Sequence, residues 1–423
     1  MKTRPRVLPE SLPDSVAEAV DFVTANVLGK RDVVGATLET ALAALSEVYT
    51  GAVRGGRAPV HVSNTTHEAA LAARARFFFL RDLPKVSLPL DELREVRALP
   101  KRPAWRVLDV GAGLGAMAFG VAHAAKRHNL CESLDVVAID HDPRSMAWMS
   151  AFAQQIEKNE ELRNEFVPTR VSVRSLNVAT DPLQSLGEFD LIVCGFVLNE
   201  LFENDDKARA VEQRVLLLQR LAATLAHDGT LLILEPALKH TSRNLQRVRD
   251  QISASNELNV FAPCLRKGPC PMLTSERDWC HESIPYALPE RAALLARAAG
   301  LRYEGLSFSY LTLRRDGQRL RNTWSIPDGR MPFRTVSDPL PSKGKHELFG
   351  CGDAGRVRLT LLTRDETDAN HAFVNSHRGD IFEIDTPAEV AAETYEIKKK
   401  IVAAEAVTLL RDAQDPLARS KDL

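Results

Sequence analysis

One stretch constrains the fold more than any other: residues 107–115 form an apolar run that ends in three alternating glycines. Gly111, Gly113 and Gly115 permit backbone angles that other residues avoid, and the free amides of a following helix would face the same space. The stretch therefore predicts a buried strand, a tight turn and a helix start that can hold a nucleotide-like ligand. The G-x-G-x-G spacing differs from the fingerprint of a dinucleotide clamp.

Polar residues follow the neighbouring strands at the same edge of the expected sheet. Asp109 lies within the first strand, and a second predicted strand ends on Asp140, where an acid can accept both ribose hydroxyls of an adenosine. A further apolar run leads into Asn199 and Glu200. We expect these two residues near the acceptor of any transferred group. Glu235 ends another strand and is a candidate too, although simple strand termination also explains it.

The periodicity around this stretch alternates strands with helices, which indicates an α/β fold with one parallel sheet. The expected strands are 106–111, 134–140, 170–176, 189–196 and 230–235, and the expected helices are 116–127, 143–158 and 206–226.

The 423 residues are enough for several domains. We expect a helical N-terminal domain over 1–95 and a Rossmann-like core over 96–314 with a cysteine-rich insertion at 240–285. A β-rich, barrel-like unit follows over 315–390, and a helical tail over 391–423. On that tail, we interpret Lys398-Lys399-Lys400 as a solvated helix face.

Charge and composition limit the partners. The chain has 55 Lys and Arg and 56 Asp and Glu residues, so any nucleic-acid surface must be local. The N-terminus lacks the pattern of a secretion or transit signal, and no apolar stretch approaches the length of a membrane span. We expect a cytoplasmic monomer without a membrane segment.

In a reducing compartment we do not expect the six cysteines to form a disulfide framework. Cys264, Cys270 and Cys280 lie in a loop rich in proline, and Cys351 lies between two glycines and is the expected fourth ligand of a metal centre. His281 is the competing fourth ligand. Iron-sulfur clusters and zinc both take four such ligands, but the spacing lacks the short C-x-x-C pairs of zinc ribbons. Two other cysteines, Cys131 and Cys194, fit core positions.

Basic residues surround these cysteines in the sequence. They are Arg243, Arg247, Arg249, Arg266 and Lys267. Because a basic helix face leads directly into the cysteine loop, we interpret these side chains as contacts to an RNA backbone.

The turn, with Asp109 before it and Asp140 after the second strand, resembles that of the class I S-adenosylmethionine-dependent methyltransferases. This resemblance implies that Gly111, Gly113 and Gly115 border the methionine part of the cofactor and that Asp140 binds its ribose.

The cysteine motifs resemble those of a narrower family, the methyltransferase-like proteins of the mitochondrial small ribosomal subunit and their bacterial relatives. The motifs lie at 262–264, 268–271, 278–281 and 350–352, and residues 197–201 and 378–380 also fit. The likeness spans roughly residues 60–385. Residues 376–378 depart from it, because an aromatic residue is expected beside Gly379.

The narrower resemblance implies maturation of the small ribosomal subunit and binding to its rRNA. It also implies that Cys264, Cys270, Cys280 and Cys351 hold a [4Fe-4S] cluster, with structural zinc as the alternative. The sequence leaves two functions open. One is methyl transfer to an RNA base, and the other is non-catalytic rRNA binding on a methyltransferase fold. Neither an N-P-P-Y-type run nor a nucleophilic cysteine follows the fourth strand to support the first.

Overall fold

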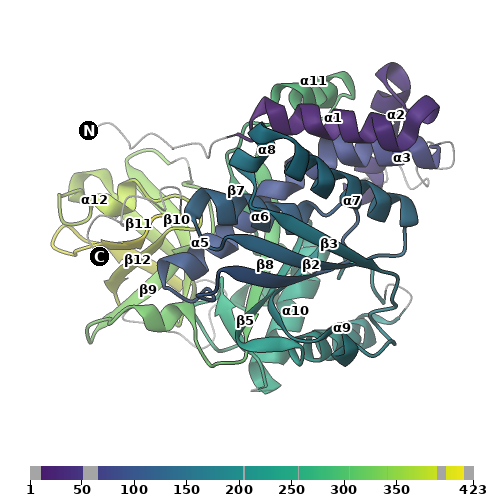
Figure 1. Cartoon of the computed structure of the whole chain (residues 1–423). Coiled ribbons are helices and arrows are strands. Elements are labelled where there is room, and N and C mark those ends of the chain that lie inside the picture. The colour runs from purple at the N-terminus through teal and green to yellow at the C-terminus, as the bar shows by residue number, and fades with distance from the viewer. Residues whose placement is uncertain are drawn as a thin grey trace.

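The computed structural model describes residues 11–50, 65–202, 205–255, 257–303, 305–340, 342–387 and 397–413. Two sheets organise the chain, one in the centre and one at the C-terminal side (Figure 1). The longer helical elements are α1 (Asp14–Leu28), α2 (Gly35–Thr50), α3 (His67–Ala73), the π-helix η4 (Arg74–Phe79), α5 (Ser87–Glu95), α6 (Ala116–His128), α7 (Pro143–Lys158), α8 (Glu160–Glu165), α9 (Lys207–Ala222), α10 (Lys239–Ser255) and α11 (Glu290–Ala298). The short ones include α4 (Leu80–Asp82), η5 (Leu83–Val86), η7 (Pro271–Thr274) and α12 (His371–Val374).

The central sheet has eight strands in the order β3-β2-β1-β4-β5-β8-β6, with β7 also paired to β8. Its strands are β1 (Ala104–Val110), β2 (Ser133–Ile139), β3 (Thr169–Arg174), β4 (Phe189–Gly195), β5 (Leu225–Pro236), β6 (Asn259–Ala262), β7 (Glu282–Ile284) and β8 (Leu306–Arg314). The predicted strands pair in parallel from β3 to β5, which confirms the α/β prediction. The sheet as a whole is mixed, because β8 runs antiparallel to β5. This is the fold of the class I methyltransferases.

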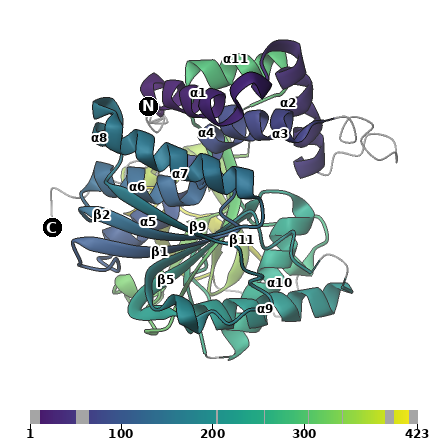
Figure 2. The ribbon, with the colours of Figure 1, turned by 45° about the vertical axis from the view of Figure 1, so that its right-hand side comes forward.

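Helices cover both faces of this sheet (Figure 2). One face carries α6 and α7, whose Phe119, Trp148 and Phe152 pack with Phe79 of η4. The other face carries α9 and α10 over a second apolar core. The N-terminal helices predicted from the sequence are present, and they share the first of these cores with the sheet.

The predicted cysteine-rich insertion is interwoven with the central sheet. It begins with α10, and its two short strands, β6 and β7, both pair with β8. The cysteine loop is therefore anchored at both ends to the same strand.

The C-terminal unit is a six-stranded sheet with its own apolar core. Its order is β13-β11-β10-β9-β12-β14, formed by β9 (Arg330–Thr335), β10 (Lys345–Gly352), β11 (Gly355–Leu362), β12 (Ile381–Asp385), β13 (Ile397–Ile401) and β14 (Thr408–Arg411). The expected β-rich unit is present at this place in the chain.

The prediction of a helical tail over 391–423 is wrong for the part that the structure describes. Residues Ile397–Ile401 and Thr408–Arg411 are strands, paired to β11 and β12 respectively. Residues 391–396 and 414–423 lie outside the described residues. Among the helices described, none is long and apolar enough to cross a membrane.

Candidate functional site

The glycine turn lies between β1 and α6 at the carboxyl edge of the sheet. All three glycines have positive φ angles, 65° at Gly111, 52° at Gly113 and 82° at Gly115. An added Cβ at Gly111 would overlap Val197, whereas one at Gly113 would meet nothing within 4 Å. An added Cβ at Gly115 would overlap Met149. The turn is thus packed at both ends and open at Gly113, where a ligand can approach the main chain.

Asp140 closes this turn from the end of β2. Its Oδ2 accepts a hydrogen bond of 2.7 Å from the amide of Gly113, and its Oδ1 accepts one of 2.8 Å from the amide of Asp142. The carboxylate is half-buried and lies beside the open part of the turn. Asp140 and Gly113, both predicted as cofactor-binding residues, are therefore in direct contact.

Asp109 lies beneath the turn in a fully buried position. Its Oδ2 accepts a hydrogen bond of 3.2 Å from the amide of Ala118 in the first turn of α6. Burial, with a smaller contribution from Asp140, raises the pKa of Asp109 to about 7. Asp109 therefore supports the turn from below and does not line the open space at Gly113.

The end of β4 holds the two predicted acceptor-side residues in different ways. The backbone nitrogen of Asn199 donates to Glu235 at 3.3 Å. In the orientation of the side-chain amide that satisfies both its oxygen and its nitrogen, that nitrogen lies 2.8 Å from the same carboxyl group. Asn199 also donates to the carbonyl of Phe196 at 2.9 Å. Glu200 is exposed. The hydrogen-bond donors of Asn199 are thus satisfied by groups of the chain itself.

Glu235, the further candidate at the end of a strand, is buried at this edge. Burial raises its pKa to about 8 despite the nearby guanidinium of Arg214. Arg214 in turn donates to the carbonyls of Leu198 and Leu201 at 2.9 and 2.8 Å. The guanidinium of Arg214 therefore holds the backbone of the turn after β4 in place.

Side chains from the N-terminal helices complete this edge, and no local sequence pattern predicts them there. Lys85 is buried, forms an ion pair of 2.7 Å with Asp82, and places its Nζ 4.8 Å from the ring centroid of Phe196. Burial lowers the pKa of Lys85 to about 8. Arg74 forms an ion pair of 3.0 Å with Asp142, next to Asp140. The helical region thus covers the end of β4 and the loop after β2.

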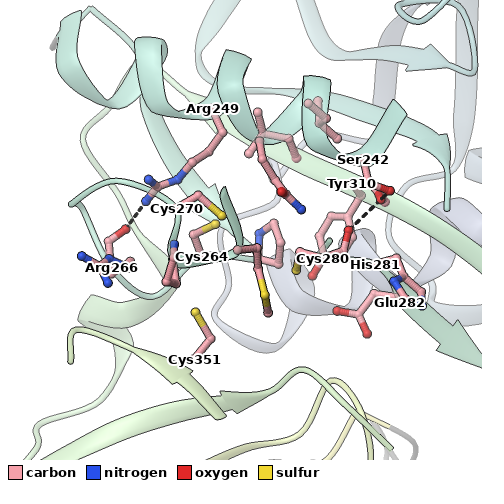
Figure 3. A pocket seen from close by; sticks show the side chains of 17 residues that line it. Ser242, Arg249, Cys264, Arg266, Cys270, Cys280, His281, Glu282, Tyr310 and Cys351 are labelled. Atoms are coloured by element: carbon pink, nitrogen blue, oxygen red, sulfur yellow. Dashed lines mark hydrogen bonds between the residues drawn. The ribbon is translucent and has the colours of Figure 1, made fainter. Parts of the chain in front are cut away.

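The four cysteines predicted as ligands line one cavity of about 50 Å³ between α10, the cysteine loop and β10. Cys264, Cys270 and Cys280 come from the loop, and Cys351 reaches toward them from the C-terminal sheet (Figure 3). His281, the competing ligand, lines the same cavity. The structure therefore brings together residues up to 87 positions apart, from Cys264 to Cys351.

The thiols are held in surroundings that disfavour an isolated thiolate. Burial and the neighbouring thiol of Cys264 raise the pKa of Cys351 to about 12, and burial raises the pKa values of Cys270 and Cys280 as well. A bound metal reverses this preference because it deprotonates a coordinating thiol. The cavity carries the donor set of a metal centre.

Unpartnered polar atoms surround the same cavity. In the part of the chain that the structure describes, both side-chain polar atoms of Gln246, Nε of Arg249, Nε of Arg266 and Nδ1 of His281 are buried without a hydrogen-bond partner. Buried polar groups normally have partners. No group of three or more His, Cys, Asp or Glu among the described residues is arranged to hold a metal ion.

The other two cysteines are core residues, as predicted. Cys131 is 7% exposed and Cys194 is 1% exposed, and all cysteines are free thiols. Burial raises the pKa of Cys131 to about 12 and that of Cys194 above its usual range. Neither thiol lines the cysteine cavity.

Arg243 does not form an RNA surface, and that prediction is wrong. The side chain is 8% exposed and donates to the carbonyls of Met272, Ser275 and Asp278 at 3.0, 2.6 and 2.8 Å. The cysteine loop has little regular structure, so these carbonyls need a donor from outside the loop, and Arg243 supplies it.

Arg249 is buried for the same reason, and the prediction of an RNA contact is wrong for it too. It is 2% exposed, donates to the carbonyls of Gly268 and Arg266, and forms an ion pair of 2.7 Å with Asp250. Asp250 accepts in turn from the amide of Cys270 at 3.0 Å. Both arginines therefore shape the loop that carries the cysteines.

The remaining basic residues of the set are placed differently. Arg247 and Lys267 are exposed, and Arg266 is partly buried against the cavity. An added Cβ at Gly355, the first residue of β11, would lie 3.2 Å from an Arg266 nitrogen. Arg266 and Lys267 thus lie where the cysteine loop meets the C-terminal sheet, and their contact with RNA stays a prediction.

Comparison with known proteins gives one family match. A family model described as mitochondrial small ribosomal subunit Rsm22 matches residues 86–383. No match was found among curated proteins.

Several solved structures resemble the chain at low identity. An S-adenosylmethionine-dependent methyltransferase of Clostridium acetobutylicum is 8% identical, with a TM-score of 0.28, over 55% of this chain and 91% of that one. A protein of Listeria monocytogenes described as a class I methyltransferase is 9% identical, with a TM-score of 0.35, over 71% and 88%. At such low TM-scores, the fold assignment depends on the strand order and pairing given above.

Proposed function

Because the chain belongs to the Rsm22 family of the mitochondrial small ribosomal subunit, we propose that it binds small-subunit rRNA. In this proposal the glycine turn holds S-adenosylmethionine, and the four cysteines hold a [4Fe-4S] cluster. The observation that carries the proposal is the convergence of Cys264, Cys270, Cys280 and Cys351 on one cavity, from a loop and a separate sheet.

The open turn supports the cofactor. The space where a Cβ of Gly113 would stand is open, and Asp140, which accepts the Gly113 amide, offers a carboxylate at the position where class I methyltransferases bind a ribose. When bound, the cofactor would supply a transferable methyl group. The residues of this chain would orient it through the amides of the turn and through Asp140.

An iron-sulfur cluster fits the four cysteines, Cys264, Cys270, Cys280 and Cys351, better than a single zinc ion does. A four-iron cluster takes one thiolate on each iron, so its ligands stand further apart than the four ligands of one zinc ion. The sequence spacing, which lacks the short C-x-x-C pairs of zinc ribbons, agrees with a cluster. Structural zinc remains the alternative, and metal analysis distinguishes the two.

Between catalysis and binding, the end of β4 favours binding. Asn199 donates to Phe196 and to Glu235, and Lys85 lies over the Phe196 ring, so this chain's own side chains occupy the edge where an acceptor base would be gripped. Methyl transfer to an RNA base is the second candidate, and the exposed Glu200 beside the turn keeps it open to test.

The test uses the full chain purified without oxygen. We expect about four irons and four sulfides per chain. Serine at Cys264, Cys270, Cys280 or Cys351 should remove them, and alanine at the core residue Cys131 should not. Stoichiometric zinc without iron would contradict the cluster in favour of structural zinc.

The same preparation tests cofactor and RNA. S-adenosylmethionine should raise the melting temperature by mass action, and Asp140→Ala should weaken this effect. Small-subunit rRNA should bind without accepting labelled methyl groups from the cofactor. Transfer of label to the RNA would instead establish the methyltransferase.

A further inference from the structure

The C-terminal unit has the connectivity of an oligonucleotide-binding barrel. Strands β9, β10 and β11 form an antiparallel meander, α12 follows, β12 returns to pair with β9, and β13 pairs in parallel with β11. Strands β13 and β14 follow one another along the chain and border the two edges of the sheet. Barrels of this kind bind oligonucleotides on the face of their second and third strands, which correspond here to β10 and β11.

The outer face of these two strands is polar and basic. Along β11, Val357, Leu359 and Leu361 are buried in the barrel core, and the residues between them are partly exposed. Arg356 and Arg358 are among these outward residues, paired in register with Cys351 and Phe349 of β10. The alternation therefore separates a dry interior from a face that carries guanidinium groups.

An aromatic residue lies at the centre of this face. The guanidinium carbon of Arg356 is 4.6 Å from the ring centroid of Phe349, and both side chains are partly exposed. Unpaired RNA bases stack on aromatic rings and on arginine planes. Phe349 with Arg356 is such a platform.

The neighbouring strand extends the charge. In the parallel pairing of β13 with β11, Lys398 lies beside Arg358 and Lys400 beside Thr360, and both lysines are exposed. The sequence pattern predicts a helix for these two lysines, and the structure has a strand. As parts of a strand, they continue the basic face to the edge of the sheet.

Acids offset part of this charge without covering the face. Glu347, 4% exposed at its side chain, pairs with Lys345 at 2.7 Å and with Arg358 at 3.2 Å. Lys400 pairs with Asp365 at 3.2 Å. Glu347 is buried under its partners, Arg356 and Arg358 are partly buried, and Lys398 and Lys400 are the exposed cations of the face.

The face is continuous with the cysteine loop. Arg356 forms an ion pair of 2.9 Å with Asp278 of that loop, and Cys351 lies at the same end of β10. Arg266 and Gly355 meet there as well. A strand laid along the face would run from β13 over Phe349 toward Lys267.

We propose that this barrel face, made of Lys345, Phe349, Arg356, Arg358, Lys398 and Lys400, binds single-stranded RNA. Only the identity of the RNA rests on the proposed function. The strands, the stacking platform and the charges are observed in the structure. Duplex RNA is excluded as the occupant, because a stacking platform needs unpaired bases.

The experiment measures fluorescence anisotropy of a labelled single-stranded 12-nucleotide RNA with the full chain over a salt series. Lys398→Gln/Lys400→Gln should weaken binding and lower the slope of log K against log salt by about 1.4, from about 0.7 for each phosphate contact. The matched control is Lys158→Gln/Lys207→Gln, which removes two exposed lysines on α7 and α9. The control should leave affinity and slope unchanged.

The platform is tested by Phe349→Leu, which keeps an apolar side chain at the barrel surface. It should weaken binding about tenfold with little change in the salt slope, because one stacked base is lost. Unchanged melting temperatures of both variants show that the barrel is folded.

Two outcomes would overturn the inference. One is unchanged affinity and slope in the Lys398/Lys400 variant, and the other is equal affinity of the wild type for a duplex of the same length. Binding of the oligonucleotide through this face without binding of small-subunit rRNA would support the site and contradict the proposed function.

Discussion

Glu235 and Asp109 are two carboxyl groups buried at the edge of the glycine turn. Burial raises the pKa of Asp109 to about 7 and that of Glu235 to about 8. In the unfolded chain both ionise near pH 4. Each group is therefore protonated in the folded chain, and ionised in the unfolded chain, over the range between these values.

This difference predicts a pH dependence of stability. Between about pH 4 and pH 8 the folded chain holds more protons than the unfolded chain, so the free energy of unfolding falls as the pH rises. Each group contributes a slope of at most about 1.4 kcal/mol per pH unit in this window. Glu235→Gln, which mimics the neutral carboxyl, should flatten the dependence measured by urea unfolding at pH 5, 6, 7 and 8. An unchanged slope in this variant would mean that Glu235 is ionised in the folded chain.

Gln246 gives a second prediction at this scale. Its side chain lines the cysteine cavity, and neither its nitrogen nor its oxygen has a partner among the described residues. With a cluster bound, the amide would donate to a cluster sulfur and stabilise the reduced state. Gln246→Leu should then lower the reduction potential by about 40 mV, which corresponds to one hydrogen bond of about 1 kcal/mol for one electron. Gln251→Leu, exposed on the same helix, is the control and should not change the potential.

At the scale of elements, local sequence patterns predicted the strands and helices of the core. They failed where pairing with a distant strand determines the secondary structure. Strands β1, β2, β4 and β5 contain apolar runs next to glycines or acids, and such runs can be recognised in the sequence without knowledge of their neighbours in the fold. In β13, Ile397 and Ile401 are four residues apart, which fits a helix period as well as a strand period. Pairing with β11 decides for the strand, and the sequence around Ile397 does not contain that information.

The candidate site shows the same division. The glycine turn, Asp140 and the four cysteines were found from spacing and chemistry. The inward direction of Arg243 could not be found, because it depends on carbonyl groups about 30 residues later that lack other donors. Lys85 was missed because its partner Phe196 belongs to another part of the chain.

The turn between β1 and α6 provides a prediction for one element. Gly113→Ala adds a methyl group at a φ of 52°, where the space is open, so the chain should fold with a penalty of about 1 kcal/mol. The same methyl group would stand where the cofactor approaches, so binding of S-adenosylmethionine by calorimetry should weaken. Gly317→Ala is matched, with a φ of 75° and open space on an exposed turn. It should show the same loss of stability and full cofactor affinity.

At the scale of the whole molecule, a buried ion cluster joins the central sheet to the C-terminal barrel. Glu92 of α5 is fully buried and pairs with Arg334 of β9 and, at 3.3 Å, with Arg411 of β14. Tyr310 of β8 donates to the same carboxylate at 2.7 Å. The cluster therefore ties α5 to three strands, β8, β9 and β14, that follow it by more than 200 residues in sequence.

This cluster also positions a cysteine ligand. Arg334 is the register partner of Cys351 across β9 and β10, and its other contact is Glu282, 3.5 Å away and two residues after Cys280. The distance between Cys351 and the cysteine loop thus depends on how Arg334 is held. Metal retention should therefore respond to a change at Glu92, which does not line the cavity.

Glu92→Gln leaves two buried guanidinium groups without their shared carboxylate. Each guanidinium keeps one carboxylate, since Arg411 also pairs with Glu95 at 2.8 Å and Arg334 with Glu282 at 3.5 Å. Urea unfolding should therefore show a loss below the about 3–5 kcal/mol that a buried charge without any partner costs. The variant should also lose iron faster than the wild type during dialysis against a chelator, because Cys351 is no longer held against the loop. Glu18→Gln, which breaks the exposed pair with Arg291, should change neither stability nor iron loss. If a destabilised Glu92→Gln chain loses iron at the wild-type rate, the iron-sulfur cluster holds Cys351 in place, and the buried ion pairs of Glu92 do not.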